Sequence, residues 1–219
     1  MIQWELPGEA LPREFYSRSA LEAAPALLGK LLCHETPEGL AAGVIVVAEA
    51  YCGPEDDGAH SYGGRRTART EIQYGEGGRA YVFGIYGMHC CLNAVTAAPG
   101  KPEVVLIRAL EPVAGLELMR ARRALTDPVQ LCNGPGKLCQ ALGITKAQYG
   151  LDLCGSALTI RSFRDIPAGQ IALSPRVNID YARQYRDRLW RFFIQGSPYV
   201  SRVPKRFAAR GVLAEIGLR

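Results

Sequence analysis

A lone carboxylate beside an aromatic ring is the first feature of this chain that could carry out chemistry. Glu49 directly follows the apolar run Val44–Ala48, which is typical of a buried strand, and Tyr51 comes two residues later. Because side chains alternate along a strand, residues 49 and 51 share one face. The turn-rich segment that follows contains the polar residues Asp56, Asp57, His60, Arg65, Arg66 and Arg69. An acid and a ring beside a positive loop could hold a flat base and act on it.

The elements that must position these residues follow from caps, apolar runs and turns. Ser19 and Glu22 fit a capping box that begins a helix ending at Gly29. The loop 52–78 is rich in Gly, Asp and Arg, and loops of this length inside compact domains are often functional. Strands are expected over 31–36, 42–51, 80–85, 89–96, 104–110, 157–161 and 192–195, and further helices over 112–123 and from about 134 to 142. With no repeat or linker, one mixed α/β domain over residues 1–219 is the simplest prediction.

The composition is that of a globular protein rather than a membrane protein. An apolar fraction of 48% is ordinary for a soluble fold, and 219 residues can bury a sizeable core. No uninterrupted apolar run approaches the roughly 20 residues that cross a bilayer. The N-terminal stretch is acidic and interrupted by prolines, unlike a signal peptide. We therefore expect a cytoplasmic location and no membrane partner.

The cysteines and histidines do not have the spacing of a metal site. The seven cysteines are odd in number and scattered, no Cys-x-x-Cys pair occurs, and the chain has only three histidines. Cys132 and Cys139 are seven residues apart in a segment predicted to be helical, where they would share a face as core thiols. The sequence thus predicts no metal.

Charge is distributed unevenly along the chain. Residues 1–60 carry 3 basic and 10 acidic side chains, a net charge of −7, whereas residues 61–219 carry 23 and 11, a net charge of +12. Most of the basic residues are arginines, whose planar fork matches phosphate. This pattern favours a nucleic-acid partner, although a GC-rich genome would also enrich arginine.

Four segments in register give the chain a family resemblance. AEAYCGPEDDGAHS, YVFGIYGMHCCLN, VLIRALEP and CNGPGKLCQAL together resemble the alkyladenine (3-methyladenine) DNA glycosylase family, and the likeness extends from about Leu11 to Val203. The resemblance implies a mixed α/β (α+β) single domain whose curved, largely antiparallel sheet is flanked by helices. It also implies a monomer without a cofactor that removes alkylated or deaminated purines, such as 3-methyladenine, 7-methylguanine and hypoxanthine, from double-stranded DNA. The purine is flipped out of the duplex and an abasic site remains.

The resemblance also assigns roles around the carboxylate. Glu49 would be the general base that activates water against the sugar, and Arg108 would position it. Tyr51, His60 and Phe83 would form the walls of a base pocket. His60 could instead be a structural hydrogen-bonding residue, and Phe83 a plain core residue. Family members tend to have tyrosine at position 83, so phenylalanine keeps the ring but loses a hydroxyl group.

A further set of residues would recognise the base and the duplex. Asn93 matches the residue at the floor of the family's pocket, where an amide can clash with the exocyclic amine of guanine. Tyr86 resembles the wedge that fills the hole left by the flipped base, with Met88 packed behind it. The residues expected to hold the DNA backbone are Arg65, Arg66, Arg69 and Lys137, although each is equally compatible with a solvated surface charge.

Asp56 and Asp57 are interpreted as loop residues rather than as a second catalytic acid, because a cationic base such as 3-methyladenine leaves without help. No lysine occurs in the pocket motifs, so lyase chemistry through a Schiff base is not expected.

Two other classes of function remain open. A nucleic-acid-binding module would lack catalysis, which the presence of Glu49 and Arg108 disfavours. A nucleosidase would act on free nucleosides, which the arginine-rich second half disfavours.

Overall fold

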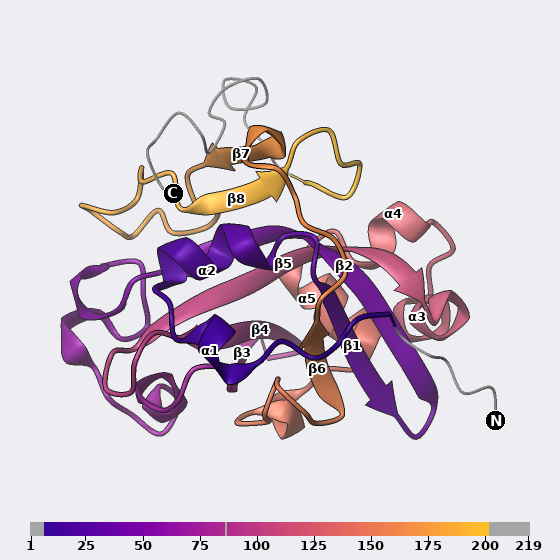
Figure 1. Cartoon of the computed structure of the whole chain (residues 1–219), viewed down its shortest axis with the longest axis horizontal. Helices are drawn as coiled ribbons and strands as arrows, with labels where there is room; N and C mark the ends of the chain where they lie inside the picture. The colour runs from indigo at the N-terminus through magenta and orange to yellow at the C-terminus, as the bar shows by residue number, and fades with distance from the viewer. Residues whose placement is uncertain (1–6, 86, 202–219) are drawn as a thin grey trace.

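All eight strands of the described part of the chain belong to one antiparallel sheet. The computed structural model describes residues 7–85 and 87–201. The strand order is β3-β4-β5-β2-β1-β6, and β8 pairs with both β2 and β7. The strands are β1 (Leu31–Thr36), β2 (Gly39–Tyr51), β3 (Ala80–Ile85), β4 (His89–Thr96), β5 (Glu103–Ala114), β6 (Leu158–Arg161), β7 (Ile171–Ser174) and β8 (Arg191–Ile194). This confirms the mixed α/β class and the curved, largely antiparallel sheet (Figure 1).

The central strand β2 changes neighbours along its length. One edge pairs with β5 over 42–51, while the other pairs with β1 over 39–44 and then with β8 over 47–49. The register between β2 and β5 shifts on both sides of Val47, and irregularities of this kind bend a strand and increase its twist. The bend lets the sheet curl, and it places the end of β2, with Glu49, between β5 and β8.

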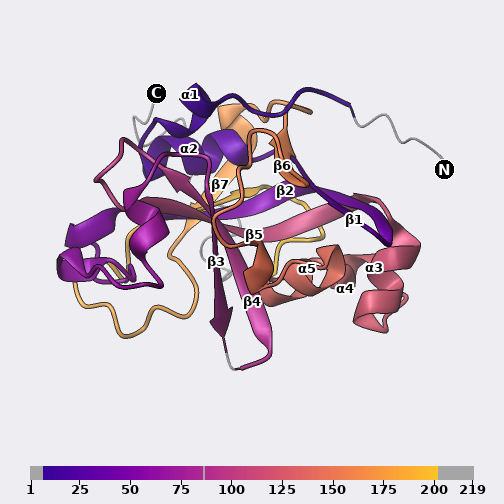
Figure 2. The same ribbon diagram turned by 90° about the horizontal axis from the view of Figure 1, so that it is seen from below.

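Helices cover both sides of the sheet. Figure 2 shows α1 (Arg13–Tyr16) and α2 (Ala20–Leu27) on one side, with α3 (Leu116–Arg123), α4 (Pro128–Leu131) and α5 (Pro135–Leu142) on the other. The predicted capping box begins α2, because the Ser19 hydroxyl accepts from the Glu22 amide and the Glu22 carboxylate accepts from the Ser19 amide. Fully buried core side chains such as Leu27, Leu32 and Ile45 each stabilise the fold by about 1.5–3 kcal/mol.

Two sequence predictions were wrong in detail. The helix expected over 112–123 begins only at Leu116, because Pro112 and Ala114 still pair with β2 and Gly115 adopts a left-handed φ of 72° that separates strand from helix. Cys132 and Cys139 do not share a helix, since Cys132 follows α4 and Cys139 lies in α5. Both thiols are nevertheless buried in the core, as expected.

Two long connections meet at one end of the sheet. The β2–β3 connection contains the short 3-10 turns η1 (Gly53–Glu55), η2 (Tyr62–Gly64) and η3 (Glu71–Tyr74), and the second connection is the segment 175–190 between β7 and β8. Asp57 joins them, because its carboxylate accepts hydrogen bonds from the backbone amides of Arg183, Gln184 and Tyr185. Beside them, the β3–β4 hairpin extends away from the body of the molecule (Figure 2).

Candidate active site

A single row of directly paired residues crosses five strands. Tyr81 of β3 pairs with Asn93 of β4, Asn93 with Leu106 of β5, Leu106 with Glu49 of β2, and Glu49 with Arg191 of β8. Residues directly opposite each other in an antiparallel sheet project from the same face. The register therefore brings Glu49 and Asn93, which lie far apart in sequence, onto one face of the sheet.

Glu49 is fully buried and is surrounded by hydrogen-bond donors. Its Oε1 lies 3.3 Å from Arg108 Nε and accepts from the Val177 amide at 3.0 Å, while its Oε2 accepts from the Tyr51 hydroxyl at 3.1 Å. Burial, followed by the nearby Glu49 charge, holds the pKa of Tyr51 well above its usual value, so the phenol keeps its proton. This set of donors matches an ionised carboxylate, which can only accept. The expected proximity of Arg108 and Tyr51 to Glu49 is confirmed.

A second arginine approaches the same carboxylate from β8. The Arg191 side chain is 1% exposed, and its Nε lies 3.9 Å from Glu49 Oε1. Its guanidinium also donates to Ser174 Oγ at 3.3 Å and to the Ser201 carbonyl at 2.6 Å. Burial lowers the pKa of Arg191 to about 10, with Glu49 acting in the opposite direction, so it stays cationic at neutral pH. Arg191 was not predicted as a site residue. The sequence indicates only that an arginine precedes the apolar residues of β8.

A cavity of about 190 Å³ lies against this face of the sheet. The sheet supplies Tyr51, Tyr81, Phe83, Cys91, Asn93, Leu106 and Arg108, the β2–β3 connection supplies Gly58, Ala59 and His60, and the segment 175–190 supplies Val177, Asn178, Ile179 and Tyr181. Five predicted site residues thus share one cavity, namely Tyr51, His60, Phe83, Asn93 and Arg108. Glu49 lies behind this surface, in contact with Tyr51 and Arg108.

Three aromatic side chains form one wall of the cavity. The rings of His60 and Phe83 meet edge to face, with centroids 4.6 Å apart, and Tyr81 lies 5.3 Å from Phe83. His60 Nδ1 is 2.8 Å from the Tyr81 hydroxyl. Burial, followed by the charges of Arg69 and Arg65, lowers the pKa of His60 to about 4, so the ring is neutral at physiological pH. His60 is therefore both a wall of the cavity and a structural hydrogen-bonding residue.

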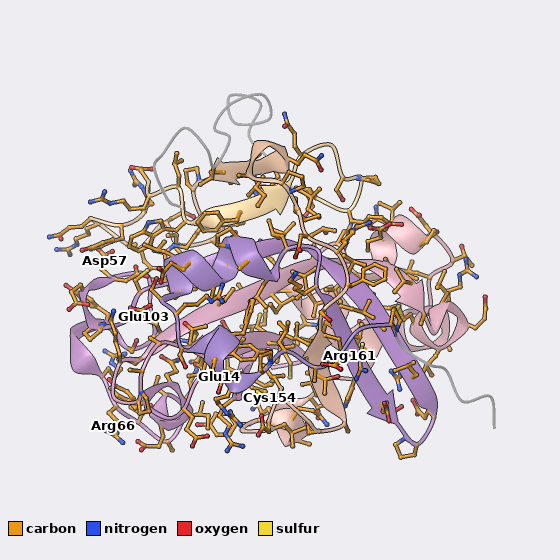
Figure 3. All side chains as sticks on the ribbon, viewed as in Figure 1. Glu14, Asp57, Arg66, Glu103, Cys154 and Arg161 are labelled. Carbon is orange, nitrogen blue, oxygen red and sulfur yellow. The ribbon has the colours of Figure 1, made fainter. Side chains whose placement is uncertain are left out.

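The other ring of the cavity, Tyr51, is supported by a buried ion pair. The guanidinium of Arg176 lies 4.5 Å from the Tyr51 ring centroid and binds Asp56 through two hydrogen bonds of 2.6 and 2.7 Å. Arg176 and Asp56 are both buried. Asp57, labelled in Figure 3, accepts three backbone amides, and both aspartates are therefore loop residues that hold the connections together, as expected.

Asn93 lies in β4, one of the two strands of the β3–β4 hairpin, within the strand expected over 89–96. The Asn93 amide donates to the Tyr81 carbonyl at 3.1 Å from a position that is almost fully buried. Met88 lies near the turn of the β3–β4 hairpin. The residue is 80% exposed, so it makes few contacts with the described residues. Tyr86, the predicted wedge, lies outside the described residues.

The predicted phosphate-binding residues differ in their surroundings. Arg66 is bound to Glu71 by two hydrogen bonds of 2.9 and 2.6 Å, and Arg65 is exposed. Arg69 lies over the Phe83 ring, and Lys137 donates to Asn133 at 2.7 Å. Their role toward DNA stays a prediction.

Residues 7–85 and 87–201 contain neither a metal-binding cluster nor a membrane-spanning helix. This part of the chain holds no cluster of three or more His, Cys, Asp or Glu side chains that could bind a metal ion. None of its helices is long and apolar enough to cross a bilayer.

Comparison with known proteins gives a consistent result. Residues 14–198 match the family model described as "Methylpurine-DNA glycosylase (MPG)". A protein of Desulfitobacterium hafniense named "Putative 3-methyladenine DNA glycosylase" is 48% identical over 199 residues, covering 87% of this chain and 98% of its own. Proteins with the same name from Natranaerobius thermophilus and Clostridium acetobutylicum are 46% and 47% identical, covering 87% and 89% of this chain and 98% of their own.

Proposed function

This chain belongs to the methylpurine-DNA glycosylase family, and we propose that it hydrolyses the N-glycosidic bond of damaged purines flipped out of double-stranded DNA. The substrates would include 3-methyladenine, 7-methylguanine and hypoxanthine, and the product would be an abasic site with an uncut backbone. The observation that carries the proposal is the buried carboxylate of Glu49, held by Arg108 and Tyr51 directly behind an aromatic cavity.

The cavity suits a flat, extrahelical base. Tyr51, His60 and Phe83 offer ring surfaces, and stacking of a base on aromatic side chains contributes roughly 1–3 kcal/mol. Asn93 lines the same cavity from β4, where its amide would clash with the exocyclic amine of guanine. Normal guanine would thereby be disfavoured, while adenine derivatives and hypoxanthine would be accommodated without this clash.

The carboxylate would act on both the water and the sugar. Water attacks the anomeric carbon while the bond to the base nitrogen breaks, and the base leaves with the bonding electron pair. Glu49 accepts the proton of the attacking water, and its charge stabilises the oxocarbenium-like transition state. A cationic base departs as a neutral molecule, so no second acid is required.

Water must first reach the carboxylate. Glu49 is fully buried, and the side chains between it and the cavity are those of Tyr51 and Arg108. We propose that entry of the nucleotide displaces at least one of these two contacts, which run between 3.1 and 3.5 Å. Catalysis would then begin only after the damaged base has been captured.

The duplex would bind across the face from which the hairpin extends. Tyr86 would insert where the base has left the stack, with Met88 behind it, and Arg65, Arg66, Arg69 and Lys137 would contact phosphates. The described residues that line the cavity include no lysine, which supports a monofunctional glycosylase without Schiff-base chemistry. One chain would act alone, as a cytoplasmic enzyme that reaches chromosomal DNA.

Single-turnover excision tests the proposal. Wild-type protein, Glu49→Gln and the control Glu38→Gln would be incubated with duplexes carrying hypoxanthine or methylated purines. Glu38 pairs with Arg122 at the protein surface, so its substitution should leave the rate unchanged. Loss of the general base should lower excision at least about 100-fold while binding of damaged DNA persists.

Near-normal turnover by Glu49→Gln would contradict the assignment of Glu49 as the general base. If the wild type binds DNA tightly but forms no product, the result would instead support a nucleic-acid-binding module without catalysis. Cleavage of free nucleosides at the rate of duplex DNA would support the nucleosidase.

A further inference from the structure

The Phe83 wall of the cavity carries the positive charge of Arg69, which lies close enough to the cavity to act on a bound base as well as on a phosphate. The guanidinium carbon of Arg69 lies 4.7 Å from the centroid of the Phe83 ring, and Arg69 Nη2 is 3.0 Å from His60 Nε2. Phe83 and His60 both line the cavity, and their rings are in edge-to-face contact. One cation therefore contacts two of the three predicted pocket walls.

The hydrogen bond from Arg69 also determines the tautomer of His60. A guanidinium can only donate, so Nε2 must accept and the ring proton must lie on Nδ1, which donates to the Tyr81 hydroxyl. Burial and the two nearby arginines lower the pKa of His60 to about 4. The imidazole thus adds no charge at neutral pH, and the positive charge of this wall is that of Arg69.

Among the described residues, Arg69 forms no ion pair with a carboxylate, in contrast to Arg66 and Arg176. Arg66 is paired with Glu71, and Arg176, which lies over the Tyr51 ring, is paired with Asp56. Within residues 7–85 and 87–201, no carboxylate oxygen lies within 4.0 Å of the Arg69 guanidinium. The cation over the Tyr51 ring is therefore balanced by its own carboxylate, whereas the cation over the Phe83 ring is not.

We propose that Arg69 sets the charge preference of the base pocket and favours neutral purine lesions over cationic ones. This inference rests on the proposed glycosylase function. A guanidinium over the ring engages the π-electron density that would otherwise attract a cationic base, and it repels a positive base directly. Hypoxanthine is neutral and escapes this repulsion, whereas purine nucleotides methylated at N3 or N7 carry a positive charge and do not.

The test compares one neutral and one cationic lesion in otherwise identical duplexes, hypoxanthine and 7-methylguanine, under single-turnover conditions with saturating protein. The quantity of interest is the rate on 7-methylguanine divided by the rate on hypoxanthine. Because each lesion has its own chemical reactivity, this ratio is compared between variants, so that the intrinsic reactivities cancel.

Three variants separate charge from structure. Arg69→Gln removes the charge but keeps an amide that can donate to His60, and Arg69→Lys keeps the charge on a different shape. Arg65→Gln removes a neighbouring charge from the surface groove that Arg69 also lines. We expect the ratio to rise roughly three- to tenfold in Arg69→Gln, because the charge is partly screened by solvent, and to stay near the wild-type value in the other two.

An unchanged ratio in Arg69→Gln would overturn the inference while leaving the glycosylase function intact. An equal rise in Arg65→Gln would overturn it as well, because the effect would then belong to the general field of the surface. Failure of the wild type to release either base would overturn the proposed function, and this inference with it.

Discussion

The lengths of their hydrogen bonds distinguish two buried acidic residues beside the cavity, Asp56 and Glu49. Asp56 accepts hydrogen bonds from Nη1 and Nη2 of Arg176 at 2.6 and 2.7 Å. It also accepts from the backbone amides of Gly58 and Cys52 at 2.9 and 3.1 Å. A carboxylate has about four lone-pair sites, so Asp56 has none to offer a water molecule. The contacts of Glu49 with the side chains of Tyr51 and Arg108 are longer, from 3.1 to 3.5 Å, and are easier to exchange. This contrast favours Glu49 as the base.

The protonation of His60 gives a prediction at the same scale. In Arg69→Gln, the pKa of His60 should rise from about 4 toward its usual value of about 6.5, but remain below it because burial is the larger cause. A histidine whose folded pKa is depressed binds protons more tightly when unfolded. The free energy of unfolding should therefore fall as pH decreases from about 6.5 to about 4, and fall less in the variant.

Titration of the His60 ring by NMR measures this shift directly. Arg66→Gln is the matched control, because that arginine pairs with Glu71, and its His60 should titrate as in the wild type. Identical titration of His60 in Arg69→Gln and wild type would contradict the contact between the two side chains.

The residues that sequence reasoning found are those whose partners are near in the chain or in a recognisable motif. Alternation along one strand was enough to place Tyr51 beside Glu49, whereas Arg108 was linked to Glu49 through the family resemblance. Arg191 was missed because its approach to Glu49 depends on pairing between β2 and β8, strands about 140 residues apart. No local pattern encodes such a register.

At the scale of elements, pairing overrode local preference where β5 ends. The residues from 112 onward have helical spacing, yet Pro112 and Ala114 pair with Gly43 and Ala42 of β2. Propensity is a weak signal beside the hydrogen bonds and burial of a central strand. The elements α1, α4 and β7, of four residues each, were not predicted from the sequence.

The hairpin gives a prediction for an element. Tyr86→Ala should weaken capture of the flipped nucleotide, because the gap left in the duplex would no longer be filled, and unstacking costs a few kcal/mol. Stopped-flow fluorescence of a base analogue at the lesion would report a smaller flipped fraction. Tyr62→Ala, an exposed tyrosine in the β2–β3 connection, serves as the control. Equal rates and amplitudes in Tyr86→Ala and wild type on every lesion would refute the wedge.

At the scale of the whole molecule, the uneven charge of the chain should appear as salt-dependent binding. The logarithm of the DNA association constant should fall linearly with the logarithm of salt concentration, and removing one phosphate contact should reduce the slope by about 0.9. We expect this reduction in Arg65→Gln and in Lys137→Gln. Arg161→Gln should keep the wild-type slope, because Arg161 lies at the end of β6, away from Arg66 (Figure 3), and donates to the Gly8 carbonyl.

Fluorescence anisotropy with undamaged duplex at several salt concentrations measures these slopes. A wild-type slope in both Arg65→Gln and Lys137→Gln would contradict the proposed contacts of Arg65 and Lys137 with DNA phosphates. An equal reduction in Arg161→Gln would show that total charge, rather than position, governs binding.

The row from Tyr81 to Arg191 constrains how this protein can change in length during evolution. The side chains of a strand alternate between faces, so a one-residue insertion or deletion within β4 would turn Asn93 away from the cavity while Glu49 stayed in place. The same event in β2 between Val47 and Glu49 would separate Glu49 from Arg191. Insertions and deletions should therefore accumulate in the connections, and the strands that build the row should keep their lengths across related sequences.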